Sequence, residues 1–95
     1  MDVKELQGMI SAWANEQFPT RTAHHVLSKL VLKEIPELLT GDLNDPDEYA
    51  DVVILIMDLA TLMGVDIAEA VERKMEINKK RRWQRDEFGL YQHVN

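Results

Sequence analysis

The sequence predicts an all-α fold of four helices in one small domain. Three observations support this prediction. Apolar residues recur at helical spacing through most of the 95 residues, capping and stop signals bound these stripes, and one stretch is apolar nearly all round, so it needs more cover than four short helices provide. We therefore expect a four-helix bundle over residues 1–95, completed by oligomerisation, with an irregular C-terminal tail from about residue 84.

The first expected helix runs from about Asp2 to Gln17, where apolar residues fall on one stripe. Phe18 and the proline that follows it end the helix. Trp13 lies on the apolar stripe and has two interpretations: a core residue, which the pattern alone favours, or a ring that stacks on a nucleotide base at the mouth of a site.

The second expected helix starts at Thr20 or Thr22, either of which can act as the N-cap, and stops at Gly41. Its apolar residues follow a 3.6-residue period. Pro36 lies near the end of this helix, where it removes a backbone donor and crowds the preceding turn. We expect a kink at this proline, or an early end that leaves Glu37 in a distorted last turn.

The third expected helix has the strongest start signal in the chain, with Asp45 at the N-cap and Pro46 at the first helical position. The run Val52–Met57 is rich in β-branched residues and is compatible with a buried strand. The cap before the run and the apolar continuation to Gly64 favour a helix of about eighteen residues. Because this helix is apolar nearly all round, it is our reason to expect a homodimer or homotetramer.

The last expected helix begins after Asp66 and carries the basic residues of the chain. Lys74, Asn78 and Arg81 are spaced by four and three residues, so they can share one helix face. A run of charges is usually a solvated face, and Lys79–Arg82 also has the composition of a nucleic-acid patch. These interpretations stay open on the sequence alone.

Two acidic pairs with the same spacing flank the turn between the second and third helices. Glu34 and Glu37 are three residues apart, as are Glu48 and Asp51. Residues at this spacing share a helix face, so two helices joined by a short turn can direct four carboxylates to one point. Clustered carboxylates repel one another unless a cation lies between them. Oxygen ligands suit Mg²⁺ or Mn²⁺, whereas the alternative is that the acids are exposed decoration of the helix surfaces.

The charge is distributed unevenly along the chain. Residues 1–72 carry fourteen acidic and four basic side chains, residues 73–95 carry three and seven, and the total is −6. An acidic body with one basic stretch does not provide a face for duplex nucleic acid. The chain has no cysteine, which excludes disulfides and thiolate ligands and fits a cytoplasmic location. We expect no secretory signal and no membrane span, since charges occur early and the longest apolar run is short.

The sequence resembles the MazG-like all-α nucleoside triphosphate pyrophosphohydrolases, whose motif is an EExxE helix followed by an ExxD helix. The matching segments read KEIPE and EYAD, and KMEINKKRRW is similar to the Lys, Asn and Arg segment of the family's last helix. The opening W…FP and the closing QHVN look most like the small dATP/dGTP pyrophosphohydrolase branch. The chain departs from the family pattern at Lys33, which replaces the first Glu, at Pro36, and in the short spacing of ten residues between Glu37 and Glu48.

The resemblance implies hydrolysis of a nucleoside triphosphate, with a deoxynucleotide as the expected substrate, to the monophosphate and pyrophosphate. It implies that carboxylates bind a metal ion, which is Mg²⁺ or, alternatively, Mn²⁺. It also implies that one carboxylate, from a pair of candidates, orients the attacking water. It also implies that side chains of the last helix neutralise the phosphates and that an aromatic ring stacks on the base. The implied metal ligands are Glu34, Glu37, Glu48 and Asp51, the catalytic pair is Glu34 and Glu37, and the substrate-binding residues are Lys74, Asn78, Arg81, Arg82 and Trp13.

A different class of function also fits the pattern. The chain can be a non-enzymatic helical interaction module in which acids and bases form solvated faces. A nucleic-acid-binding version of this module would use Lys79–Arg85. Stabilisation of the folded protein by Mg²⁺ separates the two classes, since a ligand that binds only the folded state raises the melting temperature.

Overall fold

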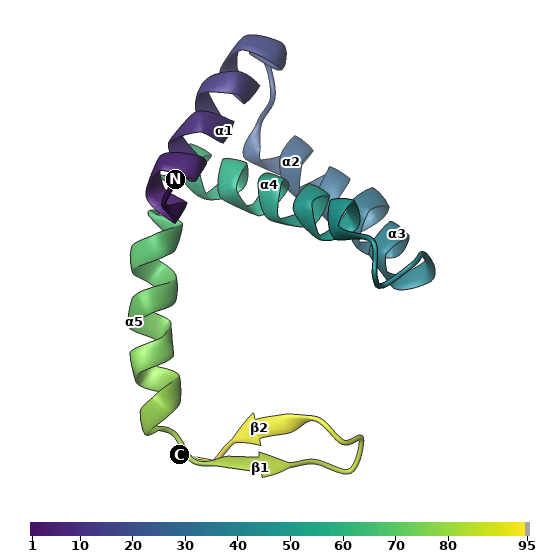
Figure 1. Ribbon diagram of the computed structural model, residues 1–95, viewed down its shortest axis with the longest axis vertical. Coiled ribbons are helices and arrows are strands. Elements are labelled where there is room, and N and C mark those ends of the chain that lie inside the picture. Colours follow the sequence, from purple (N-terminus) through teal and green to yellow (C-terminus); the bar gives the residue numbers. More distant parts are fainter. Residues whose placement is uncertain (95) are drawn as a thin grey trace.

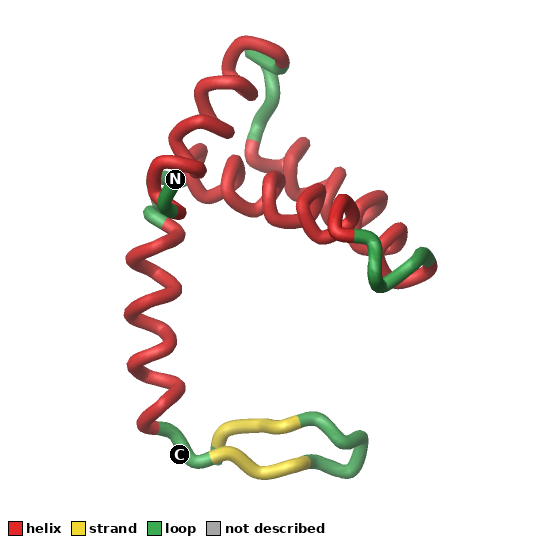
Figure 2. The backbone as a smooth tube through the Cα atoms, viewed as in Figure 1, coloured by secondary structure: helices red, strands yellow, loops and turns green. Residues whose placement is uncertain are grey.

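The computed structural model describes residues 1–94, and its helices and one hairpin trace an open C (Figure 1). Helix α1 and the helical segment α2–η1–α3 pack against α4, whereas α5 leaves this body near the end of α4 (Figure 2). In chain order the elements are α1 (Val3–Gln17), α2 (Ala23–Lys29), the π-helical turn η1 (Leu30–Glu34), α3 (Ile35–Thr40), α4 (Pro46–Leu62), α5 (Ile67–Lys80), β1 (Trp83–Arg85) and β2 (Tyr91–His93). No helix in residues 1–94 combines the length and the apolar character that crossing a membrane requires.

The N-caps lie where side-chain oxygens can accept the free N–H groups of the first turn. Asp2 accepts from the backbone N–H of Glu5 at 2.8 Å. Of the two candidate threonines, Thr22 is the cap of α2: its hydroxyl accepts from the N–H of His25, and the imidazole Nδ1 of His25 accepts from the N–H of Thr22. His25 is therefore engaged in holding the start of α2.

The predicted distortion of the second helix occurs, but one turn earlier than expected. The N–H of Ile35 donates to the carbonyl of Leu30, five residues back, which makes η1 a π turn. A wide turn before Pro36 suits a residue that lacks an N–H and crowds the turn behind it. Glu37 then lies in the regular helix α3, so the expectation of a distorted last turn at this residue is wrong. Gly41 ends α3, where a Cβ atom would lie 2.7 Å from the carbonyl oxygen of Glu37.

The run of β-branched residues in the middle of the chain is helical, as the cap before it predicted. Asp45 accepts from the N–H of Asp47, and α4 continues to Leu62. The core lies where α1 and α2–η1 meet α4. Its buried apolar residues are Ile10, Ala14, Val26, Leu30, Met57 and Ala60. Other apolar residues of α4, among them Val53 and Ile56, are exposed in the single chain.

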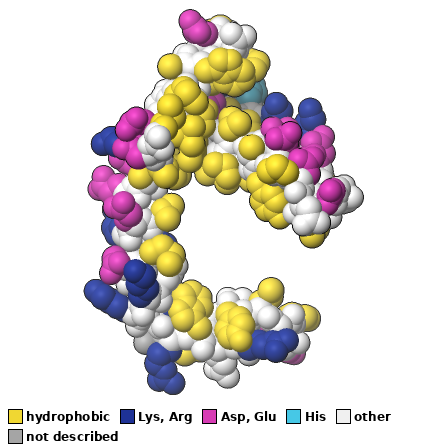
Figure 3. All heavy atoms as spheres, viewed as in Figure 1, with side chains coloured by type: hydrophobic (Ala, Val, Ile, Leu, Met, Phe, Trp, Pro, Cys, Tyr) yellow, Lys and Arg dark blue, Asp and Glu magenta, His cyan; other side chains and the backbone are white. Residues whose placement is uncertain are grey.

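Helix α5 is capped by Asp66, which accepts from the N–H of Glu69, and its packing against the body is with α1. Three apolar residues of α5, Val71, Met75 and Ile77, are exposed. The reason is that α5 projects from the body, so its apolar face has no covering element in residues 1–94. Hydrophobic side chains gather along the concave side of the C (Figure 3).

The expected irregular tail is wrong: it contains a β-hairpin. Strands β1 and β2 pair antiparallel, with Trp83 opposite His93 and Arg85 opposite Tyr91. Asp86 organises the connection, since its Oδ1 accepts from the N–H groups of residues 88 and 90, and Gly89 supplies a φ of 81°. The fold is therefore mainly α-helical and ends in a small hairpin.

Candidate metal centre

Three carboxylates from two helical segments meet beside the α3–α4 turn. One oxygen each of Glu34, Glu48 and Asp51 lies within 4.8 Å of the other two. Glu34 is the last residue of η1, and the other two lie in the first turns of α4. Glu37, the fourth predicted ligand, is not a member of this close group, although its charge acts on Glu48.

The three carboxylates differ in burial. Glu34 is only 5% exposed, Glu48 is half-buried and Asp51 is exposed. The Oε2 atoms of Glu34 and Glu48 are buried and have no hydrogen-bond partner within residues 1–94. An unpaired buried oxygen is costly, and an unpaired buried charge is more so. A bound cation would compensate this cost.

The electrostatics of the cluster agree with this geometry. The pKa of Glu48 is raised, first because burial disfavours its charged form, and then because of the negative charges of Glu37, Asp45, Asp51 and Glu34. Within residues 1–94, no Lys or Arg forms an ion pair with any of the four predicted ligands. An all-oxygen donor set with uncompensated negative charge fits a hard divalent cation such as Mg²⁺ or Mn²⁺.

The predicted phosphate-binding residues lie elsewhere in the single chain. Lys74 is exposed on α5, and Asn78, Arg81 and Arg82 lie at or just beyond its C-terminal end. The acidic cluster lies in the first two turns of α4, whereas α5 follows the end of α4, which is about 21 Å along the helix axis from Glu48. One chain therefore does not bring these side chains to its own carboxylates (Figure 1).

Asn78 has a specific environment at the end of α5. The indole Nε1 of Trp83 donates to the carbonyl of Asn78 at 3.0 Å, so β1 is attached to the helix at this residue. The side-chain Oδ1 of Asn78 is buried and has no hydrogen-bond partner in the described part of the chain.

An apolar groove of about 210 Å³ lies between α1, α2 and α4. Trp13 is 50% exposed on its wall, and its ring meets the ring of Phe18 edge to face, with centroids 5.4 Å apart. The groove residues Ile54 and Leu55 come one turn after Asp51, so the groove and the acidic cluster follow one another along α4. Trp13 therefore lines a surface groove and is not a core residue of the single chain.

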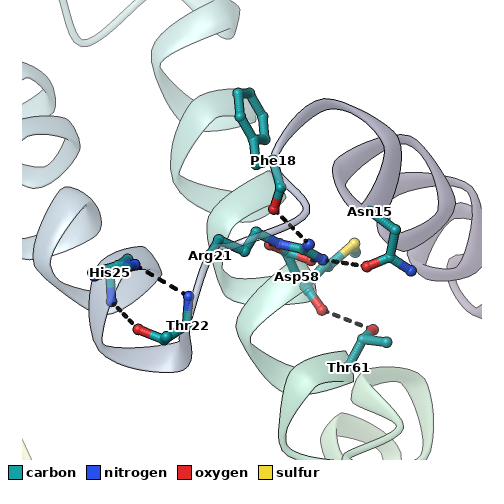
Figure 4. Close-up of polar contacts among 8 residues, drawn as sticks. Asn15, Phe18, Arg21, Thr22, His25, Asp58 and Thr61 are labelled. Atoms are coloured by element: carbon teal, nitrogen blue, oxygen red, sulfur yellow. Dashed lines mark hydrogen bonds and ion pairs between the residues drawn. The ribbon is translucent and has the colours of Figure 1, made fainter.

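A buried ion pair, which the sequence did not reveal, is part of the lining of this groove. Figure 4 shows its two residues, Arg21 and Asp58. Arg21 donates from Nε and one terminal nitrogen to the two carboxylate oxygens of Asp58, at 2.6 and 2.7 Å. It also donates to the side chain of Asn15 and the carbonyl of Phe18. The hydrogen bond to Asp58 raises the pKa of Arg21. Thirty-seven residues separate the partners, and no local spacing rule connects a loop arginine to a helix residue so far away.

Three comparisons with known proteins indicate the same family. A family model described as dATP/dGTP pyrophosphohydrolase matches residues 6–93. The chain is 49% identical over 92 residues to a dATP/dGTP diphosphohydrolase of Salmonella phage PMBT28, covering 97% of this chain but 31% of that relative. It is 46% identical over 93 residues to a dATP/dGTP diphosphohydrolase of Cyanophage S-2L, covering 97% of this chain and 88% of the relative.

A solved structure extends these similarities to the fold. It is described as the Cyanophage S-2L MazG-like pyrophosphohydrolase bound to dGDP and three catalytic Mn²⁺ ions per active site. The TM-score is 0.86 with 45% sequence identity, and the match covers 100% of this chain and 99% of the other. The present chain thus spans about a third of the Salmonella phage relative and 88% of the cyanophage relative.

Proposed function

The chain belongs to the dATP/dGTP pyrophosphohydrolase family, and on this basis we propose that it hydrolyses dATP and dGTP to the monophosphate and pyrophosphate. The observation that supports this most directly is the pair of buried, unpartnered oxygens on Glu34 and Glu48. One carboxylate oxygen of each of these residues lies within 4.8 Å of the other and of one of Asp51. Such an arrangement destabilises the fold unless a cation is bound.

Glu34, Glu48 and Asp51 would hold the divalent ion or ions, with Glu37 at the edge of the set. Bound Mg²⁺ or Mn²⁺ would neutralise charge on the triphosphate and lower the pKa of a bound water. Of the two candidate catalytic glutamates, we assign Glu37 to orient the attacking water, because it acts on the cluster by charge yet stands outside the close group. Glu34, which is buried, serves chiefly as a ligand.

The reaction is attack of water on the α-phosphorus of the nucleotide. A bond forms between the water oxygen and this phosphorus, and the bond from the phosphorus to the oxygen that bridges to the β-phosphate breaks. In this proposal the proton of the water passes to the carboxylate of Glu37, which stands next to the close group. Pyrophosphate leaves with the bridging oxygen.

Trp13 would stack on the base in the groove that follows the acidic cluster along α4. Lys74, Asn78, Arg81 and Arg82 would bind the phosphates. Because α5 stands away from the carboxylates of its own chain, this role needs a second copy, so we propose a homodimer or homotetramer. The exposed apolar residues of α4, α5 and the hairpin support assembly, as does the contrast between an acidic body and a basic C-terminal stretch. The cytoplasmic location stays a prediction.

The test is product analysis by phosphorus NMR after incubation with each common nucleoside triphosphate and Mg²⁺. The proposal expects pyrophosphate and the monophosphate, with dATP and dGTP consumed fastest, and no turnover by Glu48→Gln. Orthophosphate and a diphosphate would identify a different hydrolase. No turnover of any nucleotide by the folded parent would favour the non-enzymatic interaction module.

A further inference from the structure

Gln7 of α1 is buried at the joint between α4 and α5. It is 7% exposed, and both ends of its amide are used. Its Nε2 donates to the hydroxyl of Thr61 at 2.9 Å and to the carbonyl of Val65 at 2.8 Å. Its Oε1 accepts from the N–H of Ile67 at 3.0 Å. One side chain therefore joins α1 to the last turn of α4, to the connection, and to the first residue of α5.

These contacts lie where the direction of α5 is set. The N–H of Ile67 belongs to the first turn of α5, which has no acceptor inside the helix, and Gln7 supplies one from another element. A second side-chain contact between α1 and this joint is the ion pair of Lys4 with Asp66, at 3.5 Å. That pair is largely exposed and contributes little. Beyond this first turn, α5 projects from the body.

Because α5 is held at its N-terminal end, a small change in its direction displaces its C-terminal end by a larger distance. Asn78 is eleven residues beyond Ile67, about 16 Å along the axis, so a tilt of about 10° at the joint moves it by about 3 Å. Misplacement of a substrate-binding group by about 1 Å can cost about a hundredfold in rate. We infer that Gln7 is a positioning residue, which fixes the direction of α5 and thereby the placement of Lys74 and Asn78 on the triphosphate. The inference rests on the proposed function.

The kinetic test compares Gln7→Leu, which keeps a similar volume but loses all three hydrogen bonds, with the parent. We expect kcat/KM for dGTP to fall at least about tenfold, while the dissociation constant for Mn²⁺ alone changes less than about twofold, because the carboxylates lie at the other end of α4. Thr61→Val removes one of the three bonds and should give an intermediate loss. If Gln7→Leu does not fold, Thr61→Val takes its place in the same kinetic comparison.

Two controls separate positioning from general stability. Met57→Ala opens a cavity in the α1–α4 core but keeps all three hydrogen bonds of Gln7, so it should lower the melting temperature yet leave kcat/KM unchanged at a temperature where the protein is folded. Lys4→Ala removes the exposed ion pair at the same joint and should change neither quantity. A Gln7→Leu enzyme with parental kcat/KM, or one whose Mn²⁺ affinity falls in parallel, overturns the inference.

A second readout does not depend on activity. The chain has no cysteine, so Ser28→Cys on α2 and Glu76→Cys on α5 can be spin-labelled selectively, and dilution with unlabelled protein suppresses distances between copies. We expect a narrow distance distribution in the parent and a broader or shifted one with Gln7→Leu. An unchanged distribution overturns the inference. If the parent releases no pyrophosphate, the proposed function fails, and the distances alone decide whether Gln7 sets the direction of α5.

Discussion

A carboxylate oxygen of Glu34 in η1 lies within 4.8 Å of one of Glu48 in α4, and each residue buries an Oε2 atom that has no hydrogen-bond partner within residues 1–94. Thirteen residues of sequence separate the two, including the whole turn between α3 and α4. The π turn and the Asp45 cap bring them together. The arrangement is unfavourable for the metal-free fold, which is the physical basis of the predictions below.

In the metal-free protein, Glu48 should contribute a loss of stability as the pH rises through its titration. Folded Glu48 has a raised pKa, so between the ordinary value of 4.5 and the raised one the folded state binds more protons than the unfolded state. Glu48→Gln removes this loss. Urea unfolding in the presence of a chelator, from about pH 4 to about pH 8, should show the variant gaining on the parent as the pH rises.

The matched control for this experiment is Asp47→Asn, which neutralises an exposed acid in the same first turn of α4. The difference in the free energy of unfolding between Asp47→Asn and the parent should not increase as the pH rises. An advantage of Glu48→Gln that is constant with pH, or that shrinks as the pH rises, contradicts the raised pKa.

Breaking the buried pair of Arg21 and Asp58 should be strongly destabilising. Asp58→Ala leaves the guanidinium buried without its carboxylate, and the expected loss is about 3 kcal/mol in the free energy of unfolding, measured by urea denaturation. The double variant Arg21→Met, Asp58→Leu removes both charges and should recover much of that loss. A double variant as unstable as Asp58→Ala would show that the cost lies in packing and not in an unpaired charge.

Replacing Lys74 or Asn78 of α5 by alanine should impair turnover without unfolding the protein. Lys74→Ala and Asn78→Ala should raise KM or lower kcat by about tenfold or more, since each removes a charged or polar contact to phosphate in the proposed site. Lys79→Ala is the control, because Lys79 is exposed and pairs with Glu76 on the same helix. Parental kinetics in both Lys74→Ala and Asn78→Ala would remove this face from the site.

Sedimentation should find a species larger than the 11.0 kDa chain. Val53 and Ile56 of α4 are exposed, as are the apolar faces of α5 and of the hairpin, so the single chain leaves extensive apolar surface in water. Ile56→Asp should shift the population toward monomer, because a charge would be buried in the interface. A compact monomer at micromolar concentration contradicts the proposed assembly.

The helices could be predicted because their signals are local. Asp2, Thr22, Asp45 and Asp66 each precede an apolar stripe, and each caps the helix that follows. The π turn before Pro36 could not be placed, since the proline indicates that a helix must adapt but not on which side. The hairpin was missed because its three-residue strands are too short to show alternation.

The carboxylates of the candidate site could be predicted from the sequence, but the contacts between distant segments could not. The acid spacing indicated which carboxylates share a helix face, and three of the four meet. The contacts of Arg21 with Asp58 and of Gln7 with the α4–α5 joint depend on how distant segments pack, and sequence spacing carries no signal for either. The proposed approach of α5 to the carboxylates of a second copy is a relation between chains, which the periodicity of one chain cannot specify.

The central claim is that the acidic cluster binds a divalent metal, and paired melting curves test it most directly. The parent and Asp51→Asn are each melted in a chelator and in millimolar Mg²⁺, with Asp47→Asn as the control. A metal that binds only the folded state must raise the melting temperature, so the account predicts a clear rise for the parent and the control. For Asp51→Asn it predicts a much smaller rise, together with stability in the chelator at least equal to that of the parent, since one repelling charge is gone. An undiminished rise for Asp51→Asn, or no rise for the parent, would contradict the claim.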